Sequence, residues 1–290
     1  IYSLSFILIA MLIKSGLIGW LPDAHAEAIK GVTPILSGVL VQMGMFVIYL
    51  ISDQIPGEIK TYLIYFSIAL SALSSFMTIF ENDIKRIFAF STYTFKGYIF
   101  AIILIDKTLF IPFIIFHMFA KSFAFFVAED IYEEYGTKNL EKLKGKSIDI
   151  FKYVSFLFFI LNLAGIFPSF FLYIKKQMDF PELFNFNIVF SGIYFTKVIS
   201  TFKPKFELKI SSVFYIVPFI IYWYFSRELY YFDLNKTLIT YFLFLVGIII
   251  YVLFKNRINK VNINIFKLDN TLNIQLFGLL IFIIVETLNK

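Results

Sequence analysis

The sequence contains no cysteine and only two histidines among its 290 residues. The lack of thiols excludes disulfides, thiolate metal sites, iron–sulfur clusters and thiol catalysis within this chain. The two histidines, His25 and His117, lie far apart in the sequence and form no recognisable metal motif. We therefore expect no metal site and no cofactor site in this chain.

Charged residues are also scarce, because they make up 16% of the chain, against about 25% in soluble domains. Hydrophobic residues make up 59%. They come in runs of roughly 17 to 25, the length that a helix needs to cross a bilayer. The sequence predicts an all-α, polytopic bundle of about ten transmembrane helices. Candidate crossings lie near residues 1–20, 32–52, 60–80, 86–105, 109–131, 150–176, 183–201, 209–226, 237–254 and 272–288.

The net charge of +6 is modest and spread over the connectors. No basic stripe interleaved with stacking aromatics is present, so nucleic acid is not an expected partner. Connectors after the odd-numbered crossings hold most of the lysines and arginines, which places the "WLPDAHAEA" loop on the cytoplasmic side. Ile1 opens directly into an apolar run without a basic region or a cleavage site. We therefore expect an N-terminal portion to be missing, rather than a signal peptide to be present.

Several lysines fall inside apolar runs, where an ammonium costs about 2.5 to 3.5 kcal/mol on insertion scales. Lys152 and Lys197 are close enough to helix ends to snorkel. Lys14 and Lys121 are not, and Lys96 is intermediate, because "STYTFKGY" makes its helix partly polar and turns it towards protein. Burial disfavours an ammonium and a nearby carboxylate favours it, so a lysine between these effects can exchange protons near neutral pH.

His117 and Lys121 are four residues apart in "FHMFAKSFAFF" and so share one helix face, about 5 to 6 Å apart at Cβ. A histidine can take and release protons at physiological pH, and a proton can step between this pair directly or through one water. The alternative is a structural histidine beside a snorkelling lysine.

Two crossings carry helix breakers. Gly165 and Pro168 interrupt the crossing that continues to Lys175, and Pro22 follows Lys14. Two of the helices are thus predicted to be interrupted, near Lys14 and near Pro168. Broken helices in corresponding positions indicate transporter sites, although each break also fits a plain packing kink.

The motifs "LIKSGLIGWLPDAHAEA", "ILSGVLVQMG", "NDIKRIFAFST", "FHMFAKSFAFF" and "LAGIFPSFFLYIK" run in this order along the chain. They resemble the antiporter-like membrane subunits of respiratory complex I, a family that includes Mrp-type sodium/proton antiporters and energy-converting hydrogenases. The resemblance covers residues 1–180, expected to form a proton-channel core. Residues 181–290 are expected to add transmembrane helices of unassigned role.

The resemblance implies a proton relay. Lys14 matches the lysine that serves as the central switch, Lys121 and His117 match the next proton carriers, and Lys175 matches the residue near the exit to the outer side.

Asp23, His25 and Glu27 belong to the family's signature loop, where a structural or gating role is expected. Lys85 and Arg86 match a basic pair, read here mainly as a topology anchor.

The chain also departs from the family. Gln42 stands where relatives often have a second lysine in "SGVLLK", and an amide can hold a water but not a proton. Phe113 stands where some branches have an additional histidine. The glutamate that pairs with the switch lysine lies upstream of this sequence.

Three functions remain open. The first is a proton-translocating subunit of a redox-driven complex in a prokaryotic inner membrane, with other membrane subunits and a peripheral redox arm as partners and no redox site in this chain. The second is a subunit of a secondary sodium/proton antiporter, so that either H⁺ or Na⁺ is the ion. The third is a degenerate, structural membrane subunit.

Overall fold

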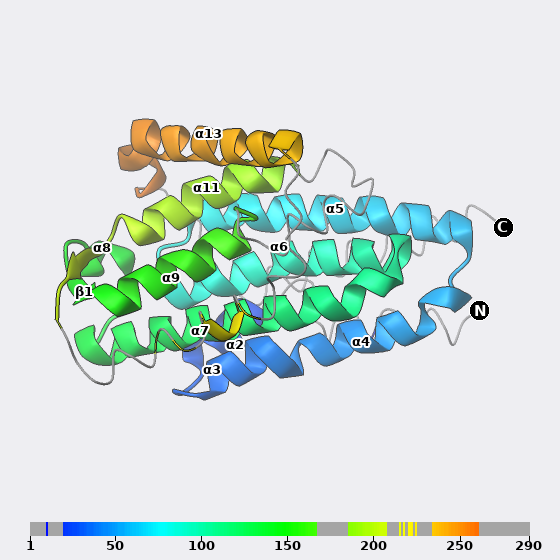
Figure 1. Cartoon of the computed structure of the whole chain (residues 1–290), viewed down its shortest axis with the longest axis horizontal. Coiled ribbons are helices and arrows are strands. Elements are labelled where there is room, and N and C mark those ends of the chain that lie inside the picture. The colour runs from blue at the N-terminus through cyan, green and yellow to red at the C-terminus, as the bar shows by residue number, and fades with distance from the viewer. Residues whose placement is uncertain are drawn as a thin grey trace.

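The chain forms an α-helical bundle, seen in a computed structural model that describes residues 20–166, 185–207 and 234–260 and a few isolated positions elsewhere. Within these residues the only strands are β1 (Ser147–Asp149) and β2 (Lys203–Lys205), which pair in parallel. The predicted fold class, an all-α polytopic bundle, is confirmed (Figure 1).

Five helices of the described residues are long and apolar enough to cross a membrane. They are Val32–Gln54, Gly57–Phe80 (α5), Ile84–Ile105 (α6), Lys107–Tyr135 and Thr237–Ile258. The first joins α3 (Val32–Ile35), the π-helix η1 (Leu36–Leu40), α4 (Gln42–Ile51) and the 3-10 helix η2 (Ser52–Gln54). The fourth joins η3 (Lys107–Leu109) and α7 (Phe110–Tyr135), and the fifth lies in α13 (Leu234–Ile258). All five lie within a few residues of predicted crossings.

The shorter helices are α2 (Leu21–Glu27), α8 (Leu140–Leu143), α9 (Ile150–Leu163) and α11 (Asn185–Ile199). Local sequence sets several helix ends. The Asp83 carboxylate accepts hydrogen bonds from the amides of Lys85 and Arg86 at the start of α6. Gly136, with φ at 65°, ends α7 in the left-handed conformation that glycine tolerates.

Helix α6 lies at the centre of the bundle, between α5 and α7 (Figure 1). Every residue of its membrane-spanning window is buried, so the prediction that this polar helix faces protein is confirmed. A row of small residues on α5 packs closely against α6. Ser71 donates to the Thr94 carbonyl at 2.9 Å, and Ser74 donates to the Phe90 carbonyl at 2.7 Å. In lipid the hydrophobic effect does not drive helices together, so close packing of small residues and hydrogen bonds between helices stabilise such crossings.

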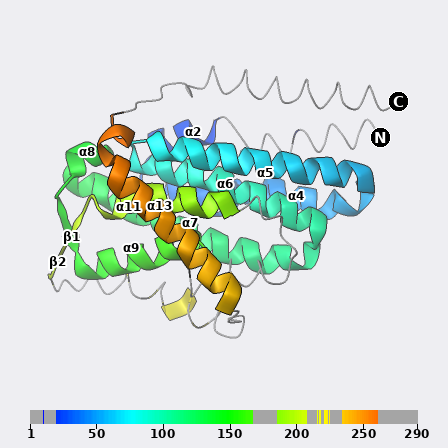
Figure 2. The same cartoon turned by 90° about the horizontal axis from the view of Figure 1, so that it is seen from above.

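Helix α13 crosses diagonally over α11 (Figure 2). Gly192 and Gly247 meet at this crossing, and a Cβ added to Gly192 would lie 2.6 Å from the Phe244 carbonyl oxygen. The two backbones can approach this closely only because both residues lack side chains.

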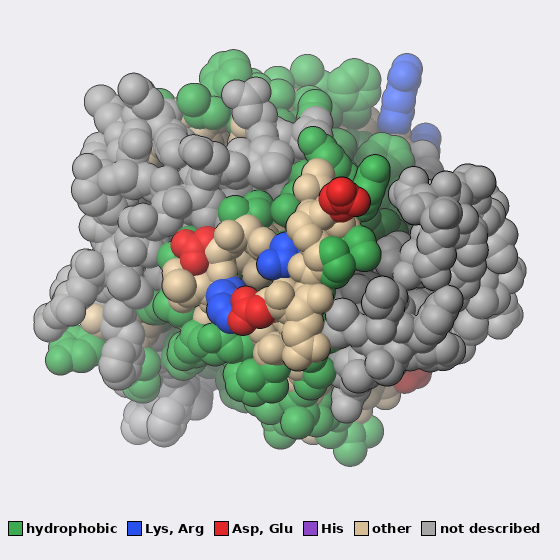
Figure 3. Space-filling view, turned by 90° about the vertical axis from the view of Figure 1, so that its right-hand side faces the viewer, with side chains coloured by type: hydrophobic (Ala, Val, Ile, Leu, Met, Phe, Trp, Pro, Cys, Tyr) green, Lys and Arg blue, Asp and Glu red, His purple; other side chains and the backbone are tan. Residues whose placement is uncertain are grey.

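The connectors among the described residues gather at two ends of the bundle. The α2 end holds residues 20–31, 81–83, 136–149 and 200–207, joined by bonds such as Ile84 N–H to the Lys138 carbonyl at 3.0 Å. The η2 end holds residues 52–56 and 106–109, where Lys107 pairs with Asp53. Figure 3 views the η2 end, where a few charged side chains gather amid apolar ones. Among these described connectors, those after odd-numbered crossings lie at the α2 end, as predicted, whereas the identity of the two aqueous sides stays a prediction.

Candidate functional site

One face of α7 carries ionisable residues that point into the bundle interior. His117 and Lys121 are 4% and 0% exposed, and the same four-residue spacing continues through Phe125 to Glu129, which is also buried. The predicted shared face of His117 and Lys121 is confirmed, and this face turns inward.

The Lys121 ammonium points into the bundle and not into lipid. Its Nζ donates to the Ser91 hydroxyl at 2.5 Å and to the Phe88 carbonyl at 3.1 Å, both on α6. The Lys121 Nζ also lies 5.3 Å from the centre of the Phe95 ring, which contacts the imidazole of His117 at 4.8 Å between ring centroids. In the described part of the chain, no carboxylate comes within 4 Å of this ammonium.

Gln42 joins His117 to a second buried lysine. Its Nε2 donates to the Ser37 carbonyl at 3.2 Å and lies 3.3 Å from His117 Nδ1. Its Oε1 accepts a hydrogen bond from Lys96 Nζ at 2.5 Å. Lys96 is 0% exposed and also donates to the Val41 carbonyl at 3.0 Å. Gln42, expected only to hold a water, thus links side chains of α6 and α7 directly.

The π-helix η1 ends at Leu40, and Val41 separates it from Gln42. Its wider turn is closed by the Val41 amide bonding to the Leu36 carbonyl at 3.1 Å. π-Helical turns inside longer helices are frequent at functional sites. Gly38, within this turn, packs directly against the hydroxyl of Ser122 on α7, which holds η1 against the ionisable face.

A small cavity, lined mainly by apolar side chains, adjoins His117. His117 Nε2 has no hydrogen-bond partner within the described residues. The cavity of about 20 Å³ is lined in part by Asn162 and Tyr222, and this volume is enough for about one water. The Tyr222 hydroxyl donates to Asn162 Oδ1 at 2.8 Å. Asn162 lies at the end of α9, so this cavity brings two polar side chains from other parts of the chain to the side of His117.

The signature loop forms α2 and is anchored to α6. Asp23 pairs with Arg86, which also bonds Glu81 at 2.9 Å. Glu27 lies 4.0 Å from Lys138. These ion pairs connect three connectors of the α2 end and hold the loop in place.

His25 is enclosed inside this end of the bundle. Its ring stacks on Phe125 with centroids 4.3 Å apart, and neither ring nitrogen has a hydrogen-bond partner among the described residues. Burial, and then the positive charges of Lys121 and Lys85, lower the pKa of His25 from 6.5 to about 3. The imidazole is therefore neutral at physiological pH.

A buried ion pair lies beside this loop. Lys85 Nζ is 3.6 Å from Glu129 Oε1, with side chains only 3% and 2% exposed. Lys85 also donates to the Ala28 carbonyl at 3.2 Å, and Glu129 accepts from the Gly31 amide at 2.8 Å. Lys85 is therefore more than the topology anchor that the sequence suggested, because its charge is satisfied inside the protein.

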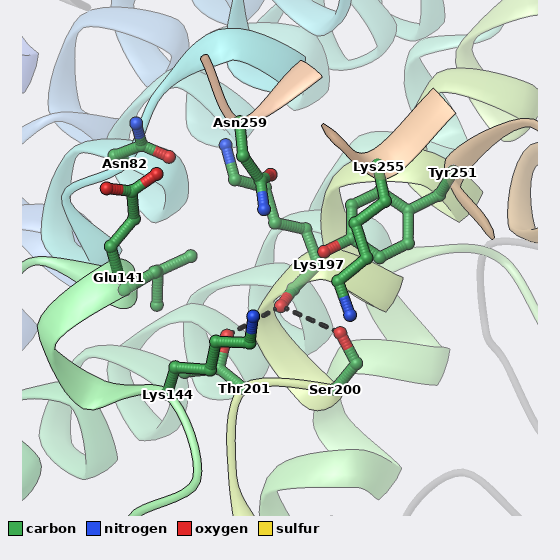
Figure 4. Close-up of a pocket in the computed structure, with 10 residues that line it drawn as sticks. Asn82, Glu141, Lys144, Lys197, Ser200, Thr201, Tyr251, Lys255 and Asn259 are labelled. Atoms are coloured by element: carbon green, nitrogen blue, oxygen red, sulfur yellow. Dashed lines mark hydrogen bonds between the residues drawn. The ribbon is translucent and has the colours of Figure 1, made fainter. Parts of the chain in front are cut away.

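The prediction that Lys197 snorkels to solvent is wrong. Lys197 is buried, and its Nζ donates to the carbonyls of Ile79 and Glu81 at 3.2 and 2.8 Å, where α5 ends. It contributes to a cavity of about 290 Å³ between α8, α11 and α13 (Figure 4). Lys144, Lys255 and Glu141 also line this cavity. Because no residue of the α7 face lines it, the cavity is separate from the ionisable site.

Part of the predicted site lies outside the described residues, namely Lys14, Lys175 and Pro168. Gly165 is described, and α9 ends at Leu163 just before it, with φ of 79° at Gly165. Pro22 lies in the first turn of α2, where its missing amide hydrogen does no harm.

Sequence reasoning missed two members of the site. Glu129 had a signal, since it continues the four-residue spacing of His117 and Lys121. Lys96 had only a weak signal, because its contact with Gln42 depends on how α4 and α6 face each other. Among the described residues no cluster of three or more His, Cys, Asp or Glu can hold a metal ion.

The apolar spans and the enclosed cations define a polytopic, integral membrane protein. The NADH:quinone oxidoreductase/Mrp antiporter transmembrane family matches residues 1–201, and the chain belongs to this family. NADH-quinone oxidoreductase subunit M of Rickettsia typhi is 28% identical over 179 residues, which cover 59% of this chain and 36% of the relative. The chain therefore spans about a third of that relative's length.

Two solved structures share the fold. One is the membrane-bound sulfane sulfur reductase, an archaeal respiratory membrane complex, with a TM-score of 0.66 and 16% identity over 86% of this chain and 57% of that chain. The other is the Mrp complex from Dietzia sp. DQ12-45-1b, with a TM-score of 0.52 and 22% identity over 77% of this chain and 41% of that chain.

Proposed function

We propose that this chain is a proton-translocating membrane subunit of a redox-driven complex. The observation that carries the proposal is the inward-facing Lys121 ammonium, which is fully enclosed and has no carboxylate within 4 Å in the described part of the chain. Ionisable groups placed in this way mark ion and proton pathways in membranes. The similarity to a subunit of an NADH-quinone oxidoreductase supports the redox-driven setting.

In this proposal, protons move by alternate charging of Lys121 and His117. A neutral imidazole accepts a proton at one ring nitrogen and releases one from the other. The cavity between His117 and Asn162 has room for the water that continues the path towards α9. Lys14 acts as the switch and Lys175 as the exit, each by resemblance alone.

Other subunits are the source of the driving energy in this proposal. A peripheral redox arm carries the electrons, and neighbouring membrane subunits transmit the resulting change to Lys14. The complex resides in the inner membrane of a prokaryote, with the α2 end on the cytoplasmic side. That end carries most of the basic connectors, as the positive-inside rule requires.

The test is Lys121→Leu in the intact complex, with proton uptake and electron transfer measured together in membrane vesicles. We expect assembly to persist and the ratio of protons to electrons to fall. Lys142→Leu is the control, because Lys142 is an exposed lysine of α8. An unchanged ratio in Lys121→Leu, with equal or greater stability, would establish the structural role instead.

A subunit of a sodium/proton antiporter is the second candidate, favoured by the fold shared with the Mrp complex. The same lysine and histidine chemistry serves either driving force. Sodium-dependent pH changes in vesicles that lack any electron donor would favour this candidate, and their absence would favour the redox-driven complex.

A further inference from the structure

One buried cation has no part in the relay described above. Lys96 lies on the fully enclosed helix α6, and its Nζ contacts Gln42 Oε1 at 2.5 Å. We propose that Lys96 is an additional proton-carrying amine of this site, coupled to His117 through the amide of Gln42. This inference rests on the proposed function and extends its relay from α7 to α6.

The hydrogen bonds of Gln42 assign the roles of both neighbours. A side-chain amide has two N–H donors and one acceptor oxygen. Both donors are used, towards the Ser37 carbonyl and towards His117 Nδ1, so His117 Nδ1 accepts and a neutral ring carries its hydrogen on Nε2. The oxygen faces Lys96, which donates. This arrangement fits a charged Lys96 beside a neutral His117.

Moving the charge requires the amide to turn. When Lys96 releases a proton through a water to His117, its amine becomes neutral and His117 gains a hydrogen on Nδ1. His117 then needs an acceptor at Nδ1, which only the opposite orientation of Gln42 supplies, and the neutral amine of Lys96 can accept from the amide in that orientation. Gln42 carries no proton itself, but its two orientations match the two positions of the charge.

The Ser37 carbonyl biases this equilibrium. It accepts from Gln42 Nε2 at 3.2 Å, and after rotation it would face the amide oxygen instead. Two acceptors facing each other are unfavourable, so the resting position of the charge is Lys96. A change in the surroundings of His117 that favours its protonated form can then move the proton from Lys96 to His117.

Lys96 also has a structural contact, since it donates to the Val41 carbonyl where η1 meets α4. A purely structural Lys96 would need only a hydrogen-bond donor. Lys96→Gln retains such a donor but cannot carry a proton, so this variant separates the two roles. Lys197→Met is the matched control, because Lys197 is an equally buried lysine that bonds only backbone carbonyls in the described part of the chain.

The decisive experiment measures protons moved per electron in vesicles that contain the assembled complex. We expect Lys96→Gln to lower this ratio at least fivefold and Lys197→Met to leave it unchanged per assembled complex.

A wild-type ratio in Lys96→Gln would overturn the inference. If Lys121→Leu still lowers the ratio in that case, the proposed function stands without Lys96. If neither variant lowers it, both fail. Should Lys96→Gln not assemble, Gln42→Met decides the matter, because it removes the amide that couples Lys96 to His117, and a wild-type ratio in this variant also overturns the inference.

Discussion

The ion pair between Lys85 and Glu129 offers a quantitative test of how this bundle tolerates charge. The two groups are 3.6 Å apart, and at an effective dielectric of about 20 their attraction is about 4.6 kcal/mol. Removing both charges from water offsets much of this, so the pair as a whole contributes little. Removing one partner leaves the other buried and unpaired, which costs about 3 to 5 kcal/mol.

The perturbation is a double-mutant cycle of Lys85→Met and Glu129→Gln. The glutamine keeps an acceptor for the Gly31 amide, which the carboxylate binds at 2.8 Å. We expect each single variant to lose about 3 kcal/mol of unfolding free energy and the double variant to lose less than about 2 kcal/mol. The coupling free energy between the two sites is then at least about 4 kcal/mol.

The assay is reversible unfolding in mixed detergent micelles, followed by circular dichroism. Lys107→Met and Asp53→Asn form the control cycle, because this pair lies at the exposed η2 end and should couple by less than about 1 kcal/mol. Additive losses in the Lys85 and Glu129 cycle would refute the reasoning, since they would mean that the two charges do not depend on each other.

Two further predictions follow from the packing and the electrostatics. Gly97→Ala places a Cβ 2.6 Å from the Ser67 carbonyl oxygen and should destabilise the protein by about 1 to 3 kcal/mol in the same assay. Gly57→Ala is the control and should not destabilise it, because no heavy atom lies within 4 Å of the added Cβ. Equal effects of the two substitutions would contradict the close approach of α5 and α6. For His25, whose pKa falls from 6.5 to about 3 on folding, the unfolded chain binds the proton first. Stability is therefore complete above about pH 6.5 and declines towards pH 3, by about 2 kcal/mol at pH 5. His25→Phe should remove this part of the acid sensitivity, and an unchanged pH profile would contradict the burial of a neutral ring.

The helices that the sequence predicts well are those set by local composition. Five crossings follow from apolar length alone, and the inward face of His117 and Lys121 follows from their spacing along one helix. The polarity of "STYTFKGY" also indicates that its helix faces protein. In each case the residues that carry the signal lie within one element.

The sequence predicts less well what depends on how helices face one another. Lys197 lies near a helix end, where snorkelling is the ordinary outcome, but carbonyls at the end of α5 take its hydrogen bonds instead. The contact of Lys96 with Gln42 joins two helices that are far apart in the sequence, so it depends on how these helices face each other. No local sequence pattern predicts either contact.

The enclosure of α6 has a consequence for how the protein enters the membrane. A helix that carries Lys96 and is surrounded by protein on all sides is a poor candidate for insertion alone, because lipid offers its ammonium no partner. Only residues 81–83 separate it from α5, whose serine row fits against it. The two helices therefore form a natural hairpin for joint insertion during synthesis, and later helices then close the remaining sides.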